Sequence, residues 1–279
     1  MPPVIGKEKH SRRQPPVSFL PVGESHRRLL MSASCTTLGE AIIGDLLYGL
    51  RQALDLIVTG DAALLEIVRL TFFVSGVALF FSSLVGIPLG AILGLKRFAG
   101  RRLVISLLYT GMGFPPVVIG LLVYMLLSRS GPFGQLDADL IPRLFTPAAM
   151  IIAQTIISFP LVAGFTMAAV MGVDPQLRQQ IRALGATPTQ TAFAVLSEAR
   201  IGVIVSIIAG FGSIISEVGA VMLVGGNIEN RTRVLTTAIV LETRKGNFGL
   251  ASALGIVLLG LAFLVNAAMM LLQGRSFDE

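Results

Sequence analysis

The order of hydrophobic and polar positions along this chain predicts an all-α membrane protein with about five transmembrane helices. A helix needs about 20 apolar residues to cross a hydrocarbon core about 30 Å thick. Five stretches meet this requirement: Leu70–Leu95, Leu103–Ser128, Thr146–Val173, Ile201–Val224 and Phe248–Gln273. We expect these stretches to be helical because a single segment in lipid satisfies its own backbone only as a helix.

Another helix is expected ahead of the first span, within residues 41–66. Its side chains separate into a polar side (Asp45, Gln52, Asp55) and an apolar side (Ile43, Leu46, Leu47, Leu50, Leu54, Ile57). This amphipathic pattern is typical of a helix lying in the membrane interface, and packing on the transmembrane bundle explains it equally well. Gly60 and Asp61 mark a break before the spanning helix.

Composition supports membrane location, because 53% of the residues are hydrophobic and only 14% are charged. Soluble domains carry about 25% charged residues. The first 30 residues hold six Lys and Arg against two Glu, which accounts for +4 of the net charge of +6. The basic character therefore belongs to the tail and does not indicate nucleic-acid binding. We expect residues 1–40 to be poorly ordered, with Met31 as an alternative start, and residues 67–275 to form the transmembrane domain.

The charges of the loops predict the orientation of the bundle. The short loop Lys96–Arg102 carries four basic residues and no acid, and such loops stay on the cytoplasmic side. This places the Gly131–Leu144 and Gly226–Asn247 loops outside, and the Gly172–Arg200 loop and the C-terminus inside. With five spans, the N-terminus lies outside.

The longest inside loop predicts two short helices joined by a turn, at about 174–190. Asp174 is suited to cap the first helix, and Pro175 to occupy its first turn. Gly185 is suited to a left-handed residue after that helix, and Thr187 with Pro188 restarts a helix. A short helix with the apolar stripe Leu177, Ile181 and Leu184 should dock onto a soluble partner or the membrane surface.

This segment resembles the coupling-helix motif of ABC importer permeases. The run Gln179-Gln-Ile-Arg-Ala-Leu-Gly185-Ala-Thr-Pro aligns with the family's Glu-Ala-Ala-x-x-x-Gly, with Gly185 at the central glycine. In this chain Gln179, Gln180 and Ile181 stand where the family has Glu-Ala-Ala.

Three further segments resemble the sulfate, molybdate and tungstate permeases. They are Gly113-Phe-Pro-Pro-Val-Val-Ile-Gly120, Ser128-Arg-Ser-Gly-Pro-Phe-Gly134 and Ile215-Ser-Glu-Val-Gly-Ala-Val-Met-Leu-Val-Gly-Gly-Asn-Ile228. Together with Ser197-Glu-Ala-Arg200, the last run is most similar to the tungstate-type permeases.

The resemblance implies the type I, molybdate/sulfate-permease-like ABC importer fold in a bacterial inner membrane. It also implies a homodimeric pore, a cytoplasmic ABC ATPase dimer and an extracytoplasmic oxyanion-binding protein. Tungstate is the expected cargo, molybdate the next, and sulfate or another anion the alternative. The chain contains no Gly-x-x-x-x-Gly-Lys-[Ser/Thr] phosphate loop, so we expect ATP and Mg to bind to the partner ATPase. The residues expected to contact the ATPase are Arg178, Gln179, Ile181, Arg182, Leu184, Gly185 and Ala186, with lipid headgroups as the alternative for the two arginines.

Candidate pore and gate residues are those that interrupt apolar spans. They are Pro115, Pro116, Glu217, Gly219 and Asn227. The proline pair kinks the second span, either to shape a gate or for packing. Glu217 is the only ionisable residue inside an expected span, and a carboxylate repels an anion. We therefore favour a structural role for Glu217 over a gate or coupling role, and over substrate contact.

At the outer end of the fourth span, Arg231 and Arg233 are candidates for attracting the anion or contacting the binding protein. Solvated loop arginines are the alternative. No cluster of His or Cys suggests a metal site or a catalytic residue. The rival class is an ion-coupled secondary transporter, which would show more buried ionisable residues and an internal repeat.

Overall fold

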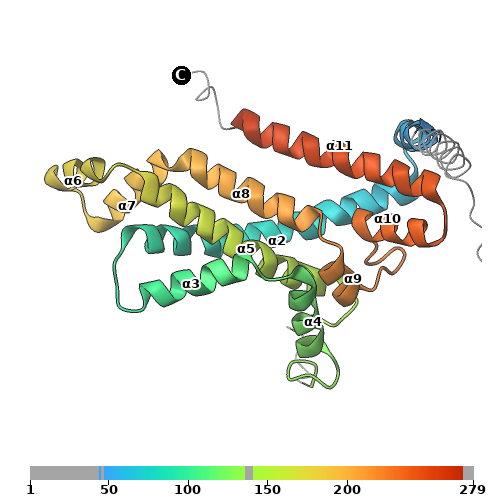
Figure 1. Ribbon diagram of the computed structural model, residues 1–279, viewed down its shortest axis with the longest axis horizontal. Coiled ribbons are helices and arrows are strands. Elements are labelled where there is room, and N and C mark those ends of the chain that lie inside the picture. Colours follow the sequence, from blue (N-terminus) through green and yellow to red (C-terminus); the bar gives the residue numbers. More distant parts are fainter. Residues whose placement is uncertain (1–43, 45–46, 136–140, 273–279) are drawn as a thin grey trace, which may run out of the picture. The chain divides into compact units, whose positions relative to one another are not determined.

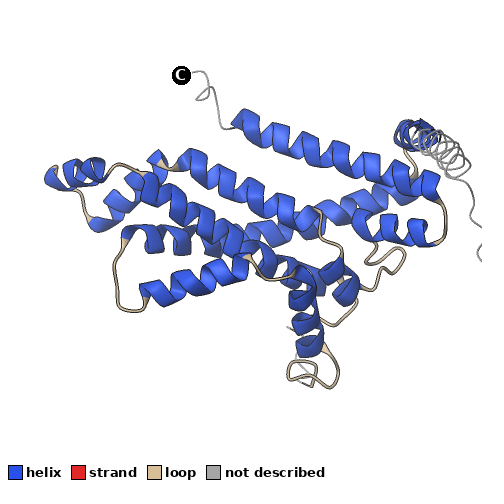
Figure 2. Ribbon diagram, viewed as in Figure 1, coloured by secondary structure: helices blue, strands red, loops and turns tan. Residues whose placement is uncertain are grey.

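The structure is a computed structural model that describes residues 44, 47–135 and 141–272. Every regular element among them is a helix, which confirms the all-α prediction (Figure 2). The tail expected over residues 1–40 lies outside the described residues, as does part of the helix expected over 41–66.

A helix over residues 47–59 comes first and is followed by ten labelled helices (Figure 1). These are α2 (Ala62–Leu95), α3 (Arg101–Met112), α4 (Pro116–Leu127), α5 (Pro147–Gly172), α6 (Pro175–Ala183), α7 (Pro188–Glu198), α8 (Arg200–Ile215), α9 (Gly219–Gly225), α10 (Leu235–Arg244) and α11 (Phe248–Leu272).

Three of the described helices are long and apolar enough to cross a membrane, namely α2, α5 and α11. They correspond to the first, third and fifth expected spans. Two bent helix pairs, α3 with α4 and α7 with α8, raise the total to five if each pair is one span. The described residues therefore form a helical bundle with three to five candidate spans, in agreement with the expected number.

The second expected span is not one kinked helix. Its helix ends at Met112, α4 starts at Pro116, and the two axes differ by 101°. Pro115 has an extended conformation with ψ of 123°, which suits a residue that precedes another proline. The proline pair thus separates two helices, because neither proline offers an N–H to continue the ladder.

The fourth expected span is also interrupted. Its helix α8 ends at Ile215, and α9 begins at Gly219. Glu217 lies in the break between them, so the expectation that it sits inside a spanning helix is wrong. A run of apolar residues identifies membrane depth, whereas backbone breaks within it depend on side chains that replace the lost hydrogen bonds.

The bundle is built on close packing of α2 against α5. A Cβ atom on Gly86 would lie 3.1 Å from Val162 Cγ1, and one on Gly90 would lie 2.9 Å from Thr166 Cβ. Gly94 lies against Val170 in the same way, because a Cβ on Gly94 would lie 2.9 Å from the Cβ of Val170. This row of glycines therefore serves packing within the chain, since small residues let helix backbones approach each other in lipid.

The segment with α6 and α7 lies at one end of the long helices, and α10 lies at the opposite end (Figure 1). At one end, called the α6 end, Arg101 Nε donates to the Leu93 carbonyl at 2.8 Å, and Leu95 packs with Leu177 against Val195. At the other, called the α10 end, the Leu235 N–H donates to Thr71 Oγ1 at 3.0 Å. The loop 96–102 and the 174–200 segment share the α6 end, as the predicted orientation requires.

The helix over 47–59 contacts the bundle with one side. Ala53 is buried, Leu56 packs against the same apolar cluster, and a Cβ on Gly49 would lie 2.6 Å from Ser252 Cβ of α11. Other apolar side chains remain exposed, among them Leu50, Leu54 and Ile57. The helix ends before Gly60, whose φ is +60°, and Asp61 caps α2 by accepting the Leu64 N–H at 2.8 Å. The expected helix interval of 41–66 therefore contains the predicted break.

The α2–α5 contact generates a test in which one chemical change has opposite effects at two positions of α2. Gly90→Ala should lower stability by about 1–3 kcal/mol, because the new methyl group enters the backbone of α5 near Met167 N at 3.0 Å. Gly76→Ala should be neutral or raise stability by up to about 1 kcal/mol, because nothing lies within 4 Å and alanine favours helix.

Thermal unfolding of both variants in detergent, followed by circular dichroism, measures the difference. Equal midpoints for the two variants would contradict the close α2–α5 packing.

Candidate functional site

Two short helices, α6 and α7, project from the α6 end and form the first candidate site. Asp174 accepts the Gln176 N–H at 2.8 Å, and Pro175 occupies the first turn, which confirms the predicted start of α6. Gly185 has φ of +86°, so it adopts the left-handed conformation predicted for it. Thr187 and Gln190 then form a reciprocal capping box at the start of α7, with Thr187 N–H donating to Gln190 Oε1 at 2.8 Å.

The inner side of α6 is fixed against the bundle. Leu177 packs with Val170 and Val173, and Arg178 Nη2 donates to the Val170 carbonyl in the last turn of α5. Leu177 is thus not part of a free apolar stripe, and Arg178 holds α6 to α5. A guanidinium is well placed there, since the last carbonyls of a helix lack partners and carry partial negative charge.

The outer side of α6 and the following turn remain open. No residue of α6 is buried, and Leu184 is 88% exposed. Gln179, Arg182 and Gly185 are exposed as well, while Ile181 and Ala186 are half-buried. On α7, Phe193 is 74% exposed, a feature the sequence reasoning missed. An apolar knob on a rigid turn is suited to enter a groove on another molecule.

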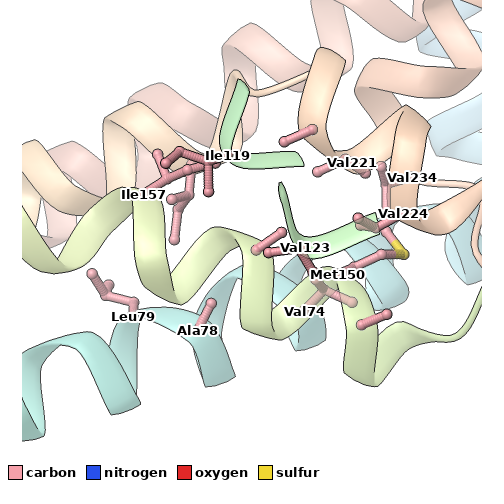
Figure 3. Close-up of a cluster of buried hydrophobic side chains, with 14 of the residues drawn as sticks. Val74, Ala78, Leu79, Ile119, Val123, Met150, Ile157, Val221, Val224 and Val234 are labelled. Atoms are coloured by element: carbon pink, nitrogen blue, oxygen red, sulfur yellow. The ribbon is translucent and has the colours of Figure 1, made fainter. Parts of the chain in front are cut away.

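The two helix breaks meet at a second candidate site. α4 and α9 start at Pro116 and Gly219, and Gly219 lies against Val117, so these two helix starts are adjacent. The contact is close because a Cβ on Gly120 would lie 2.5 Å from Ala220 Cα. Figure 3 shows Ile119 and Val123 of α4 in one apolar cluster with Val221 and Val224 of α9. The structure therefore brings the predicted gate residues Pro115, Pro116, Glu217 and Gly219 together.

Glu217 closes this junction with hydrogen bonds. Its Oε1 accepts the Ala220 N–H at 2.8 Å, so the carboxylate caps α9, and its carbonyl accepts Thr236 Oγ1 at 3.0 Å. Among the described residues no arginine or lysine lies within 4.0 Å of its carboxylate. These hydrogen bonds replace backbone bonds lost at the break, and they are of the kind that the structural role favoured from the sequence requires; that role stays a prediction.

Gln154 of α5 supports the other side of the break. Its Nε2 donates to the Ile214 carbonyl at 3.2 Å, and the side chain is buried. The same carbonyl accepts the Glu217 N–H at 3.2 Å. Gln154 is the single amide side chain of α5, and this is the signal that could have identified the contact from the sequence.

Asn227, the remaining pore candidate, lies at the opposite end of α9, so the structure does not bring it to the break. It follows Gly226, which ends α9 with φ of +72°, and has φ of +52° itself. Its Oδ1 is buried without a hydrogen-bond partner among the described residues.

The outer arginines surround a hollow at the α10 end, the third candidate site. Arg231 and Arg233 lie in the turn before α10, and Arg69 and Glu66 of α2 line the same region. Arg233 Nη1 lies 3.5 Å from Glu229 Oε1. The sequence reasoning missed Arg69 and Glu66, although both lie within four residues before the uncharged run that starts at Leu70.

Another charged pair at the α10 end involves two residues that are three apart in the chain. Lys245 Nζ donates to Glu242 Oε1 at 2.8 Å, and this bond holds the pKa of the Glu242 carboxyl below its ordinary value. Within the described residues no three His, Cys, Asp or Glu side chains form a group suited to a metal ion.

Comparison with known proteins gives these sites a context. Residues 86–277 match the profile of the family described as binding-protein-dependent transport system inner membrane component. The chain is 44% identical over 209 residues to a "probable anion ABC transporter permease protein" of Haloferax volcanii, covering 73% of this chain and 88% of the relative.

Two other relatives name a cargo. The chain is 39% identical over 225 residues to the tungstate uptake system permease protein TupB of Peptoclostridium acidaminophilum, covering 81% of this chain and 96% of the relative. It is 31% identical over 204 residues to the molybdenum transport system permease protein ModB of Escherichia coli K12, covering 71% and 89%.

A solved structure shares the fold. A bacterial alginate ABC transporter, in complex with an alginate pentasaccharide-bound periplasmic protein, aligns over 90% of this chain and 96% of its own with a TM-score of 0.66 and 21% identity. The expected type I importer-permease fold is therefore confirmed.

Two substitutions of Glu217 distinguish whether stability depends on its hydrogen bond to the Ala220 N–H or on its negative charge. Glu217→Gln keeps an oxygen acceptor for the Ala220 N–H and should change stability little, whereas Glu217→Ala should lower it by about 1 kcal/mol. Glu198→Ala, at the exposed end of α7, is the matched control and should be neutral. Thermal unfolding in detergent measures all three. If Gln destabilises as much as Ala, the charge and not the cap is required.

Proposed function

Because the chain belongs to the family of binding-protein-dependent transport system inner membrane components, we propose that it is the permease subunit of an ATP-driven importer for tungstate. The observation that carries the proposal is the 39% identity to a tungstate permease over 96% of that relative's length. The molybdenum permease is more distant at 31%, so molybdate ranks second and sulfate or another oxyanion third.

The proposed assembly contains a second copy of this chain, a cytoplasmic ABC ATPase dimer and an extracytoplasmic oxyanion-binding protein. Its support is the family description, which names a transport system that depends on a binding protein. The ATP and Mg belong to the ATPase, because this chain carries no phosphate-binding loop of the Gly-Lys-Ser/Thr type. This chain then serves as a non-catalytic pore.

On the cytoplasmic side, the turn at Leu184 and Gly185 is the proposed contact with the ATPase. Leu184 offers the exposed apolar knob, and Arg182 adds a positive charge beside it. Arg178 has a different role, since its bond to the Val170 carbonyl makes α6 move with the end of α5. Displacement of the turn by the ATPase is thereby passed to α5.

Helix α5 connects this contact to the breaks. It runs from the α6 junction at Gly172 to its start at Pro147, and Gln154 near that start holds the Ile214 carbonyl at the end of α8. A shift of α5 therefore pulls on the α8–α9 break, where Glu217 and the proline pair of the α3–α4 break lie. We assign the gate to this junction. An ion-coupled secondary transporter has weaker support, because the family description names a binding protein.

Cargo and energy source are tested together in vesicles that hold this chain with its ATPase. When the tungstate-loaded binding protein is added on the side opposite the ATPase, radiolabelled tungstate should cross the vesicle membrane only if ATP is present. Vanadate should stop this transport. Calorimetry of the binding protein with tungstate, molybdate and sulfate checks the anion. Accumulation without nucleotide would reject the importer, and a protein that binds only sulfate would reject the cargo.

A separate test addresses the coupling turn. Gly185→Val should abolish vanadate-sensitive uptake while membrane insertion stays intact, because valine in the left-handed conformation costs about 1–2 kcal/mol and rearranges the turn. Gly185→Asn should retain part of the uptake, since asparagine tolerates this conformation.

Gly260→Val is the matched control, because nothing lies within 4 Å of that exposed glycine of α11, its φ is not positive, and it lies outside the α5–α6 junction. It should transport at nearly the normal rate. Normal uptake by Gly185→Val would remove the coupling role from this turn.

A further inference from the structure

The start of α2 and the turn before α10 line two neighbouring hollows at the α10 end, and we call the larger, open one the arginine pocket. Its lining includes Arg69 and Glu66 of α2 with Asn230 and Arg231 of the turn, whereas Arg233 lines the smaller hollow beside it. The arginine pocket has a volume of about 320 Å³. Because a water molecule takes about 30 Å³ in the liquid, this space admits a small anion with several waters.

The turn that carries two of the arginines is rigid. Three consecutive N–H groups, those of Arg231, Thr232 and Arg233, donate to the Ile228 carbonyl at 3.3, 2.9 and 3.0 Å. The fully buried Thr232 hydroxyl donates to the Gly225 carbonyl at 2.6 Å and accepts the Ile228 N–H at 2.9 Å. The arginines are therefore presented by a fixed backbone, which lowers the entropy lost on binding.

The α2 side of the pocket is attached to the turn. Thr71 Oγ1, two residues after Arg69, accepts the Leu235 N–H at 3.0 Å and donates to the Ile67 carbonyl at 2.7 Å. Thr71 and Leu235 are both buried. Arg69 is thus held on a wall that faces the turn, although it lies far from Arg231 in the sequence.

The charges of the pocket favour an anion. Arg69, Arg231 and Glu66 line it, which leaves one net positive charge. Within the described chain no carboxylate lies within 4.0 Å of the Arg69 or Arg231 guanidinium, whereas Arg233 of the smaller hollow is paired with Glu229.

We propose that the arginine pocket binds a small tetrahedral oxyanion and is the cargo's entry site on this chain. Planar guanidinium groups donate in pairs to oxyanion oxygens, and no carboxylate among the described residues competes for the donors of Arg69 or Arg231. Glu66 reduces the attraction, and a transport site must release what it binds. The identity of the anion rests on the proposed function, whereas the site itself rests on these residues.

The competing occupant is an acidic edge of the binding protein. An acidic protein edge is expected to meet arginines that protrude from the surface, whereas here Arg69 and Arg231 line a hollow. The geometry therefore favours a free ion, and the binding-protein contact becomes an outcome of the test.

The test measures binding of radiolabelled tungstate to the purified full-length chain in lipid nanodiscs without binding protein. Arg69→Gln and Arg231→Gln should each raise the Kd about tenfold or more, because each removes a charge-assisted hydrogen bond. Glu66→Gln should lower the Kd about two- to fivefold by removing a repelling charge. Arg244→Gln, which removes an exposed arginine of α10 outside the pocket, is the matched control and should bind normally.

Two measurements separate folding from binding. Thermal unfolding midpoints should be unchanged in the variants, and Arg231→Lys, which keeps the charge but loses the paired donors, should fall between wild type and Arg231→Gln. Unchanged midpoints with graded Kd values support the site.

Three outcomes overturn the site: no tungstate binding by the wild-type chain, arginine variants that bind normally, or variants that weaken only the association with the binding protein. The proposed function fails separately. Arginine-dependent tungstate binding without ATP-driven uptake keeps the site and rejects the importer, whereas uptake that is unaffected in the arginine variants keeps the importer and rejects the site.

Discussion

Close approach of helix backbones is the constraint on which the rest of this structure depends. In lipid, apolar surface gains little by leaving one apolar environment for another, so packing and hydrogen bonds must hold helices together. Gly86, Gly90 and Gly94 remove the side chains that would keep α2 away from α5, and Gly120 does the same between α4 and α9. Helix α5 is thereby placed at the centre of the bundle, where α2, α3, α4, α8 and α9 all pack on it.

This packing permits two interrupted helices at membrane depth. Free N–H and carbonyl groups are costly in lipid unless protein groups replace their partners. At the α8–α9 break Glu217 satisfies an N–H of α9, Gln154 donates to the Ile214 carbonyl, and Thr236 donates to the Glu217 carbonyl. These contacts explain why a carboxylate lies near the proposed anion path. Glu217 hydrogen-bonds the backbone of α9, and the break in which it lies is also held by Gln154 of α5 and Thr236 of α10.

The features predicted correctly from the sequence are those that depend on neighbouring residues. Asp174, Gly185 and Thr187 mark helix ends through local hydrogen bonds and φ, and long apolar runs identify α2, α5 and α11. The angle of 101° at Pro115 was not predictable, because a proline pair interrupts a helix but the packing of α4 on α9 sets its direction. The hydrogen bond of Arg178 to the Val170 carbonyl and the position of Arg69 in one hollow with Arg231 were not predicted, because both arise from tertiary structure.

The arginines at the two ends of the bundle have different surroundings, which suit some of them to hold helix ends and others to bind an anion. At the α6 end, Arg101 donates to the Leu93 carbonyl and Arg178 to the Val170 carbonyl, so each occupies the negative C-terminal end of a long helix. Each guanidinium thus has a donor engaged by the chain itself and fixes the end of α2 or α5, against which the coupling turn is presented, while the buried Nε of Arg178 has no acceptor among the described residues. At the α10 end no carboxylate lies within 4.0 Å of the Arg69 or Arg231 guanidinium in the described part of the chain. Positive charge is structural where backbone carbonyls meet it, and it is available to an incoming anion where they do not.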